Sequence, residues 1–210
     1  MLDCTPFMMR GVSYSPVPWS HDPSYHEPFG DYFTDEFHDI VKRDLALFVE
    51  MGANTVRLYA WRLKTRHMKF LDLAFDLGLV VSSAFEMGTA EDTPIGTAQE
   101  RAIALAHLQR RLQISKHRAL VMWQVGNELN GAWNEYVCDD AYATKFLHAP
   151  CTFGDDAAKL CEFIDDMCQL VHSEGGWLCS SPFAGVNPPA KYTYGTECDG
   201  KPCYSVHGEP

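Results

Sequence analysis

Strand-like and helix-like segments alternate along most of this 210-residue chain, and this alternation constrains the fold more than any other feature. Short runs rich in β-branched and aromatic residues are each followed by a longer segment with apolar residues at helical spacing. Such alternation predicts a parallel sheet covered by helices. The expected strands are 11–15, 54–61, 79–85, 120–125 and 177–183, and the expected helices are 35–51, 65–77, 97–116 and 155–173.

Two α/β architectures fit this alternation, a doubly wound open sheet and a (β/α)8 barrel. An open sheet usually carries a glycine-rich phosphate turn after its first strand, whereas residues 15–19 read Ser-Pro-Val-Pro-Trp. The two prolines cannot supply free backbone N–H groups to such a turn. The sequence therefore predicts a TIM-type (β/α)8 barrel that is incomplete, with about five to six βα units in one partial domain over residues 1–210.

The charge of the chain excludes several classes of partner. Lys and Arg number 17 against 28 Asp and Glu, which gives a formal charge of −11. A protein this acidic lacks the basic surface that binds nucleic acid through phosphates, and it has no polybasic segment for an anionic membrane. No apolar run approaches the roughly 20 residues of a membrane-spanning helix. The nine histidines lack ligand spacing, so we expect no metal and no cofactor.

Eight cysteines are many for a chain of this size, and an even number favours disulfides in an oxidising, secretory or extracellular compartment. The first six residues contain no signal peptide, so either the protein stays inside the cell or the chain begins downstream of its true start. Cys161, Cys168 and Cys179 lie in apolar segments and are expected as buried thiols. The better disulfide candidates flank polar loops: Cys138 with Cys151, and Cys198 with Cys203.

Polar residues follow the predicted strands at their carboxyl ends, where a (β/α)8 barrel carries its chemistry. These residues are Tyr14 on the first strand, Arg57 on the second, Glu86 after the third, and Asn127 and Glu128 after the fourth. A carboxylate, an arginine and an amide at one barrel mouth suit the recognition of sugar hydroxyls and glycosidic acid–base chemistry. Partial desolvation by the barrel wall would raise the pKa of Glu128 and make it a usable general acid.

Each of these residues also has a structural interpretation. Arg57 is alternatively a buried ion-pair partner, and Glu86 is alternatively a solvated loop residue. Trp133 and Tyr136, in the long loop after the fourth strand, are either sugar-stacking platforms or loop anchors. Asn127 and Glu128 are adjacent and would point to opposite faces of a regular strand. Both can face a substrate only if the strand distorts at Gly126.

Three segments resemble glycoside hydrolase clan A. Residues 123–130 (WQVGNELN) look like the Gly-Asn-Glu motif of strand four in that clan. Residues 11–16 (GVSYSP) resemble the first strand of its family 2 and of family 72, the β-1,3-glucanosyltransferases. Residues 43–59, which include MGANTVRLY, are similar to the helix and second strand of those families. The three motifs occur in the expected order.

The resemblance implies a retaining glycosidase or transglycosylase that acts on β-linked oligo- or polysaccharide. It implies that Glu128 is the general acid/base, that Asn127 binds the sugar 2-hydroxyl and that Arg57 steadies the nucleophile. From their positions at the strand ends and in the loop after the fourth strand, Tyr14, Glu86 and Trp133 are expected to contribute to substrate binding. The nucleophile of this clan is a Glu at the end of strand seven, which at about 31 residues per repeat falls near position 220, beyond this chain. The alternative is a non-catalytic, carbohydrate-binding or structural remnant of such a barrel.

Overall fold

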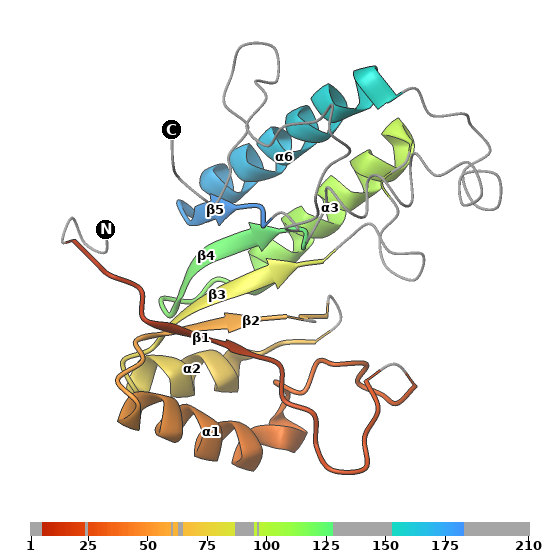
Figure 1. Ribbon diagram of the computed structural model, residues 1–210. Coiled ribbons are helices and arrows are strands. Elements are labelled where there is room, and N and C mark those ends of the chain that lie inside the picture. The colour runs from red at the N-terminus through yellow and green to blue at the C-terminus, as the bar shows by residue number, and fades with distance from the viewer. Residues whose placement is uncertain are drawn as a thin grey trace. The chain divides into compact units, whose positions relative to one another are not determined.

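The computed structural model describes residues 6–23, 25–59, 61–62, 65–86, 95, 97–127 and 153–182. Strands and helices alternate through these residues (Figure 1). The elements are β1 (Gly11–Tyr14), η1 (Asp35–Phe37), α1 (His38–Glu50), β2 (Thr55–Leu58), α2 (Met68–Asp76), β3 (Val80–Phe85), α3 (Ala98–Ile114), β4 (Leu120–Val125), α6 (Phe153–Gly175) and β5 (Leu178–Ser180).

The five strands form one parallel sheet in the order β1-β2-β3-β4-β5. Gly11 of β1 lies opposite Thr55 of β2, and Thr55 lies opposite Val80 of β3. Sequential order is that of a (β/α)8 barrel, whereas a doubly wound sheet would place β1 between later strands. The predicted fold class, an α/β chain with the strand order of an incomplete (β/α)8 barrel, is therefore confirmed.

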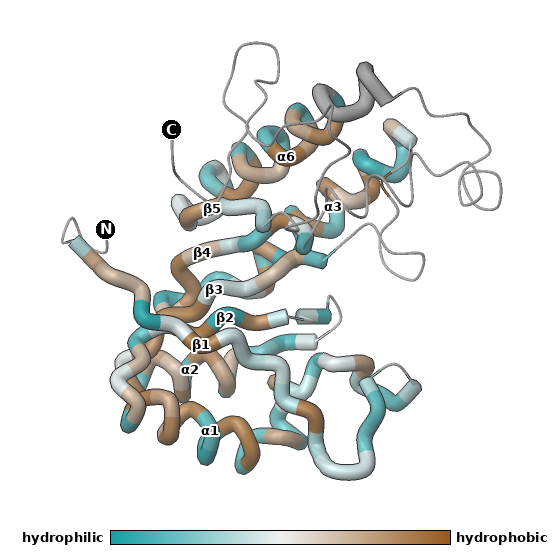
Figure 2. The backbone as a smooth tube through the Cα atoms, viewed as in Figure 1, coloured by the Kyte–Doolittle hydropathy of each residue, from teal (hydrophilic) through white to brown (hydrophobic). Residues whose placement is uncertain are grey.

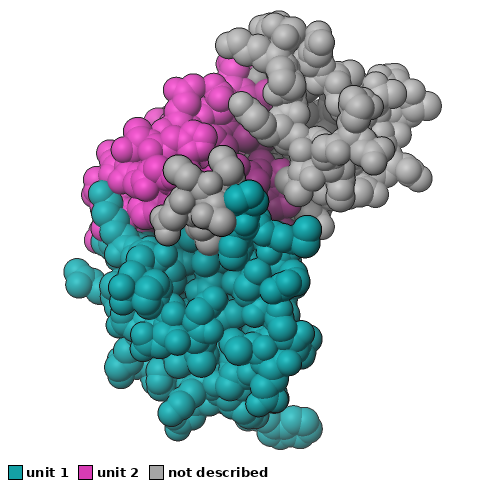
Figure 3. Space-filling model, turned by 90° about the vertical axis from the view of Figure 1, so that its left-hand side faces the viewer, with its two compact units in different colours: residues 1–84, 114–122 teal, residues 85–113, 123–210 magenta. Residues whose placement is uncertain are grey.

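The chain divides into two compact units, which Figure 3 distinguishes by colour. The first comprises Met1–Ala84 and Ile114–Met122, and the second comprises Phe85–Gln113 and Trp123–Pro210. We describe each unit by itself. The expected single domain over residues 1–210 remains a prediction.

Helix α1 of the first unit shows how the local pattern determines burial. Val41 and Leu45 are buried, one turn apart, whereas Leu47 is about half exposed because two residues turn it by roughly 200° around the helix. Figure 2 shows the resulting mixture of apolar and polar residues along α1. The helix ends before Gly52, whose φ of +82° is the left-handed conformation that glycine adopts most readily.

Several predicted elements are longer than the observed ones. The second strand was expected over 54–61 and the fifth over 177–183, but β2 spans Thr55–Leu58 and β5 spans Leu178–Ser180. The second helix was expected from residue 65, but α2 begins at Met68 because His67 is held in a buried contact described below. Residues 204–206, where the strand of a sixth βα unit is expected from the sequence, lie outside the described residues.

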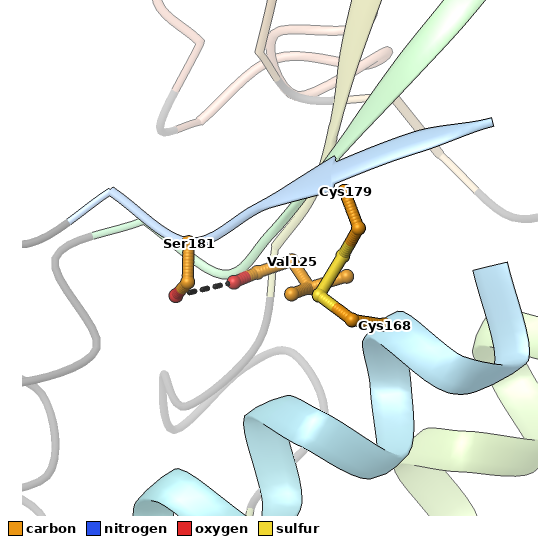
Figure 4. The surroundings of a disulfide bond; sticks show 4 residues. All are labelled: Val125, Cys168, Cys179 and Ser181. Carbon is orange, nitrogen blue, oxygen red and sulfur yellow. Dashed lines mark hydrogen bonds between the residues drawn. A yellow bond between two sulfur atoms is a disulfide. The ribbon is translucent and has the colours of Figure 1, made fainter. Parts of the chain in front are cut away.

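In the second unit, a disulfide between Cys168 and Cys179 joins α6 to β5, with a Cα–Cα distance of 5.4 Å (Figure 4). Cys161 is disulfide-bonded as well. The expectation that these three cysteines are thiols was wrong. Free and disulfide-bonded cysteines are both commonly buried, so an apolar sequence environment does not distinguish them. Ser181, next to β5, donates a hydrogen bond of 2.9 Å from its Oγ to the carbonyl oxygen of Val125 in β4. The proposed pairs Cys138–Cys151 and Cys198–Cys203 lie outside the described residues.

Candidate functional site

Strand β2 separates an apolar face from a polar face. Val56 and Leu58 are completely buried, as befits the side that α1 and α2 cover. Tyr14 of β1 marks the same side, since its ring contacts Phe48 of α1 with 5.1 Å between centroids. Side chains alternate along a strand, so Arg57 projects from the opposite face. In a (β/α)8 barrel that face of the sheet lines the interior of the barrel.

Arg57 is the centre of a polar row across three strands. It lies in register with Ser13 of β1 on one side and with Ser82 of β3 on the other. Residues in register share a face of a parallel sheet, so the side chains of Ser13, Arg57 and Ser82 project from one face. The Arg57 guanidinium also stacks over the Tyr59 ring at 4.4 Å from its centroid. This row offers a positioned cation and hydroxyl groups, which suit a carboxylate or the hydroxyl groups of a sugar.

Tyr14 is engaged with the helix layer. Its hydroxyl donates a hydrogen bond of 2.9 Å to Oδ2 of Asp44, which also forms a 2.7 Å ion pair with Arg43. Burial, followed by the hydrogen bond and the charge of Asp44, raises the pKa of Tyr14 well above its usual range. In this arrangement the hydroxyl connects β1 to α1. Its substrate-binding role remains a prediction.

In the second unit, Glu86 directly follows β3, and Asn127 lies two residues beyond β4. Both side chains are partly exposed. Gly126 between β4 and Asn127 has a φ of +78°, and its N–H donates a 2.8 Å bond to the carbonyl oxygen of Phe85. The backbone is therefore distorted at the position where the sequence required it. Glu128 lies outside the described residues, so its orientation remains a prediction, as does the role of Asn127.

Trp133 and Tyr136 also lie outside the described residues, and their roles remain predictions. Within the described ranges, no group of three or more His, Cys, Asp or Glu side chains is placed to hold a metal ion. None of the helices described is long and apolar enough to cross a lipid bilayer.

The sequence analysis missed a buried pair between Asp31 and His67. Nε2 of His67 lies 2.7 Å from Oδ1 and 2.9 Å from Oδ2 of Asp31, and the two side chains are at most 1% exposed. The Trp61 ring stacks on His67 at 3.9 Å between centroids, and the backbone N–H of Arg62 donates to Asp31. The pair joins the loop after β1 to the segment between β2 and α2. Its two residues are 36 positions apart in the sequence, and no local pattern indicates that they meet.

No protein family model matches this chain, and no curated protein sequence does either. Solved structures are similar to it in fold. β-Glucuronidase 2 of Bacteroides uniformis, covalently bound to cyclophellitol-6-carboxylate aziridine, has a TM-score of 0.54 and 18% identity over 87% of this chain and 19% of that one.

Two sugar-converting enzymes are similar as well. A sugar phosphate isomerase/epimerase from Parabacteroides distasonis has a TM-score of 0.52 and 13% identity, covering 91% of this chain and 60% of that chain. D-Psicose 3-epimerase, solved in the presence of D-fructose, has a TM-score of 0.53 and 15% identity, covering 83% and 52%. The chain spans less than two thirds of each of these proteins. At such low identity the likeness supports the fold alone, and it is shared with a glycosidase and with sugar isomerases or epimerases.

Proposed function

We propose that this chain is part of a retaining glycoside hydrolase or transglycosylase of clan A, related to families 2 and 72, that acts on β-linked polysaccharide. The observation that carries the proposal is the position of Arg57, in register between Ser13 and Ser82 on the face of β2 opposite Val56 and Leu58. This is where the clan resemblance requires a strand-two arginine. The fold likeness to a β-glucuronidase supports the same class.

In the proposed mechanism, Glu128 protonates the glycosidic oxygen as the leaving group departs, and then deprotonates the attacking water or sugar hydroxyl. Asn127 binds the 2-hydroxyl of the sugar. Arg57 holds the nucleophilic carboxylate in its ionised form, because a guanidinium beside a carboxylate favours the charged state. The nucleophile itself is expected outside these 210 residues. The proposal assigns no metal or organic cofactor.

Two other functions compete with this proposal. One is a carbohydrate-binding remnant of such a barrel, which would bind sugar without turnover. The fold likeness to two sugar isomerases or epimerases favours an enzyme that interconverts free sugars. Turnover of a β-glycoside, turnover of a free keto or aldo sugar, and binding without turnover are separate results that distinguish the three.

The first test measures the binding of short β-linked oligosaccharides by calorimetry. Replacing Arg57 with Ala should weaken binding at least about tenfold, because a buried, charge-assisted interaction is lost. Arg118→Ala is the matched control, since Arg118 also stacks on an aromatic ring, 3.5 Å from the Phe75 centroid, but lies before β4 rather than within a strand. Equal affinities for the wild type and Arg57→Ala would contradict the proposed site.

The second test uses a form of the protein that hydrolyses β-glycosides. Glu128→Gln should lower turnover by about 10²–10⁴-fold on substrates with poor leaving groups, because the transferable proton is gone. Activated aryl glycosides need little protonation, so their glycosylation step should suffer much less. Equal losses on both substrates would show that Glu128 only binds sugar.

A further inference from the structure

The loop between β1 and α1 presents a tryptophan to solvent. Trp19 is 97% exposed, whereas Trp61, Trp123 and Trp177 are all buried. Tyr25 in the same loop is 80% exposed. An indole ring has a large apolar surface. Leaving it in water forgoes the favourable free energy that its burial would contribute. An exposed aromatic ring of this size offers a flat, largely apolar face that a ligand can contact.

The backbone holds Trp19 at the tip of a tight turn. The N–H of His21 donates a 3.0 Å hydrogen bond to the carbonyl oxygen of Pro18, so Trp19 and Ser20 are the two central residues. Ser20 has a φ of +68°, a left-handed conformation at the turn position that usually takes glycine. We call residues 18–21 the display turn. A serine in this conformation is strained, and such strain is commonly retained at binding sites.

The display turn is anchored at its end by packing of aromatic rings. The His21 ring contacts Tyr32 at 5.6 Å and Phe37 at 5.8 Å between centroids, both in edge-to-face geometry. Tyr32 and Phe37 are buried and contact each other at 5.0 Å. Trp19 is thus exposed two residues before a partly buried ring that packs on the core residues Tyr32 and Phe37. A platform held in this way loses little conformational entropy when it binds.

The charge of the loop decides what the platform can bind. Residues 15–34 contain no Lys or Arg, and their acidic side chains are Asp22, Glu27 and Asp31. Arg62, a cation that contacts this loop from outside it, is engaged there, since it pairs with Glu27 at 3.4 Å and lies over the Phe29 ring. Nucleic acids, anionic lipids and anionic polysaccharides all need nearby cations, which this loop does not supply. The apolar face of an uncharged pyranose ring meets no such requirement. It presents C–H groups to the electron-rich face of an aromatic ring.

We propose that Trp19, on the display turn, is a stacking platform for the pyranose rings of a neutral β-linked polysaccharide, separate from the polar row around Arg57. The inference rests on the proposed function for its choice of a carbohydrate. It adds to that function a second point of attachment, on the loop after β1, and restricts the substrate class to neutral glycans. The platform retains long chains and has no part in the chemistry.

The test is affinity electrophoresis of the 210-residue protein in gels that contain laminarin, hydroxyethyl cellulose or galactomannan, with alginate as the anionic comparison. Trp19→Ala should weaken retardation by a neutral polysaccharide about tenfold, and Trp19→Phe should retain most of it. Met51→Ala is the control, because Met51 is also largely exposed, at 73%, but lies at the end of α1. Oxidation of exposed tryptophan by N-bromosuccinimide should be slowed by the bound polysaccharide in the wild type.

Three results would overturn the inference. One is equal retardation of the wild type and Trp19→Ala, or no retardation of the wild type by any neutral polysaccharide. Another is retardation by alginate that depends on Trp19. The third is a change from dimer to monomer in sedimentation of Trp19→Ala with unchanged retardation, which would make the turn a contact between copies. Binding of short oligosaccharides is expected to depend on Arg57 and not on Trp19. Its measurement therefore tests the proposed function independently of the platform.

Discussion

The beginning and the end of the described chain hold their strands and helices together by different means. In the first unit, the loop after β1 is fixed by the buried Asp31–His67 pair, and β1 is joined to α1 by the Tyr14–Asp44 hydrogen bond. In the second unit, α6 is joined to β5 covalently, through Cys168 and Cys179. Similar βα segments are therefore secured by noncovalent polar contacts in one unit and by a covalent bond in the other.

Removing the Asp31 carboxylate should have the largest effect on stability. Asp31→Ala leaves Nε2 of His67 and the backbone N–H of Arg62 without their acceptor. Each buried group left unsatisfied typically costs about 1–3 kcal/mol in the free energy of unfolding. Asp31→Asn retains an oxygen acceptor and should lose less. Urea denaturation followed by circular dichroism measures both variants.

An Asp–His pair whose carboxylate is exposed provides the matched control for this prediction. Asp72 lies 3.1 Å from Nε2 of His117, and its side chain is 67% exposed. Asp72→Ala should change the free energy of unfolding by no more than about 1 kcal/mol. If Asp31→Ala and Asp72→Ala lost the same stability, the buried pair would not be what secures the first unit.

Removing the disulfide should have the next largest effect, and only in the second unit. The two cysteines are 11 residues apart, and closing a loop of that length restricts the unfolded chain by about 3 kcal/mol. The double variant Cys168→Ser, Cys179→Ser should lose about that much stability. Hydrogen exchange should show the loss in α6 and β5 and leave β1, α1 and β2 protected.

Reduction of the wild type is the complementary measurement. Dithiothreitol should destabilise α6 and β5 in the wild type. It should have a smaller effect there in the double variant, where Cys161 of α6 keeps its own disulfide. Loss of exchange protection in β1 and β2 on reduction would contradict the division between noncovalent and covalent support.

The sequence predicted the elements because their signals are local. Apolar spacing within α1 and alternation within β2 each involve residues a few positions apart, so both can be seen without a structure. The start of α2 was misplaced because His67 is held by Asp31, 36 residues away. The disulfide between Cys168 and Cys179 was missed because cysteine burial does not distinguish bonded from free sulfur.

The candidate site divides in the same way. The face on which Arg57 lies follows from the apolar residues on either side of it in β2, so the sequence was sufficient for it. The sequence also marked Gly126 as the point where the strand must distort if Asn127 and Glu128 are to face one side, and the left-handed backbone found there is one that glycine adopts cheaply. The hydrogen bond from Tyr14 to Asp44 was not, since the partners are 30 residues apart and meet only when α1 packs on β1.

The smallest effect is expected at Tyr14, where it depends on pH. Tyr14→Phe removes one hydrogen bond and should cost about 1 kcal/mol near neutral pH. The pKa of Tyr14 is raised in the folded protein by burial, by the hydrogen bond to Asp44 and by the charge of that carboxylate. The unfolded chain releases the phenolic proton near its ordinary pKa of about 10, whereas the folded protein retains it.

Ionisation of Tyr14 therefore favours unfolding as the pH rises above about 10, and the stabilisation by its neutral hydroxyl is complete only below that value. Urea midpoints measured between about pH 7 and 12 should fall less steeply for Tyr14→Phe than for the wild type, so that the two curves converge at alkaline pH. Tyr32, whose pKa burial also raises, contributes equally to both proteins. Tyr25→Phe, at an exposed position, should follow the wild type throughout. Parallel curves for Tyr14→Phe and the wild type would show that the hydroxyl of Tyr14 ionises in the folded protein as readily as in the unfolded chain, so β1 would not be joined to α1 by a protonation-dependent contact.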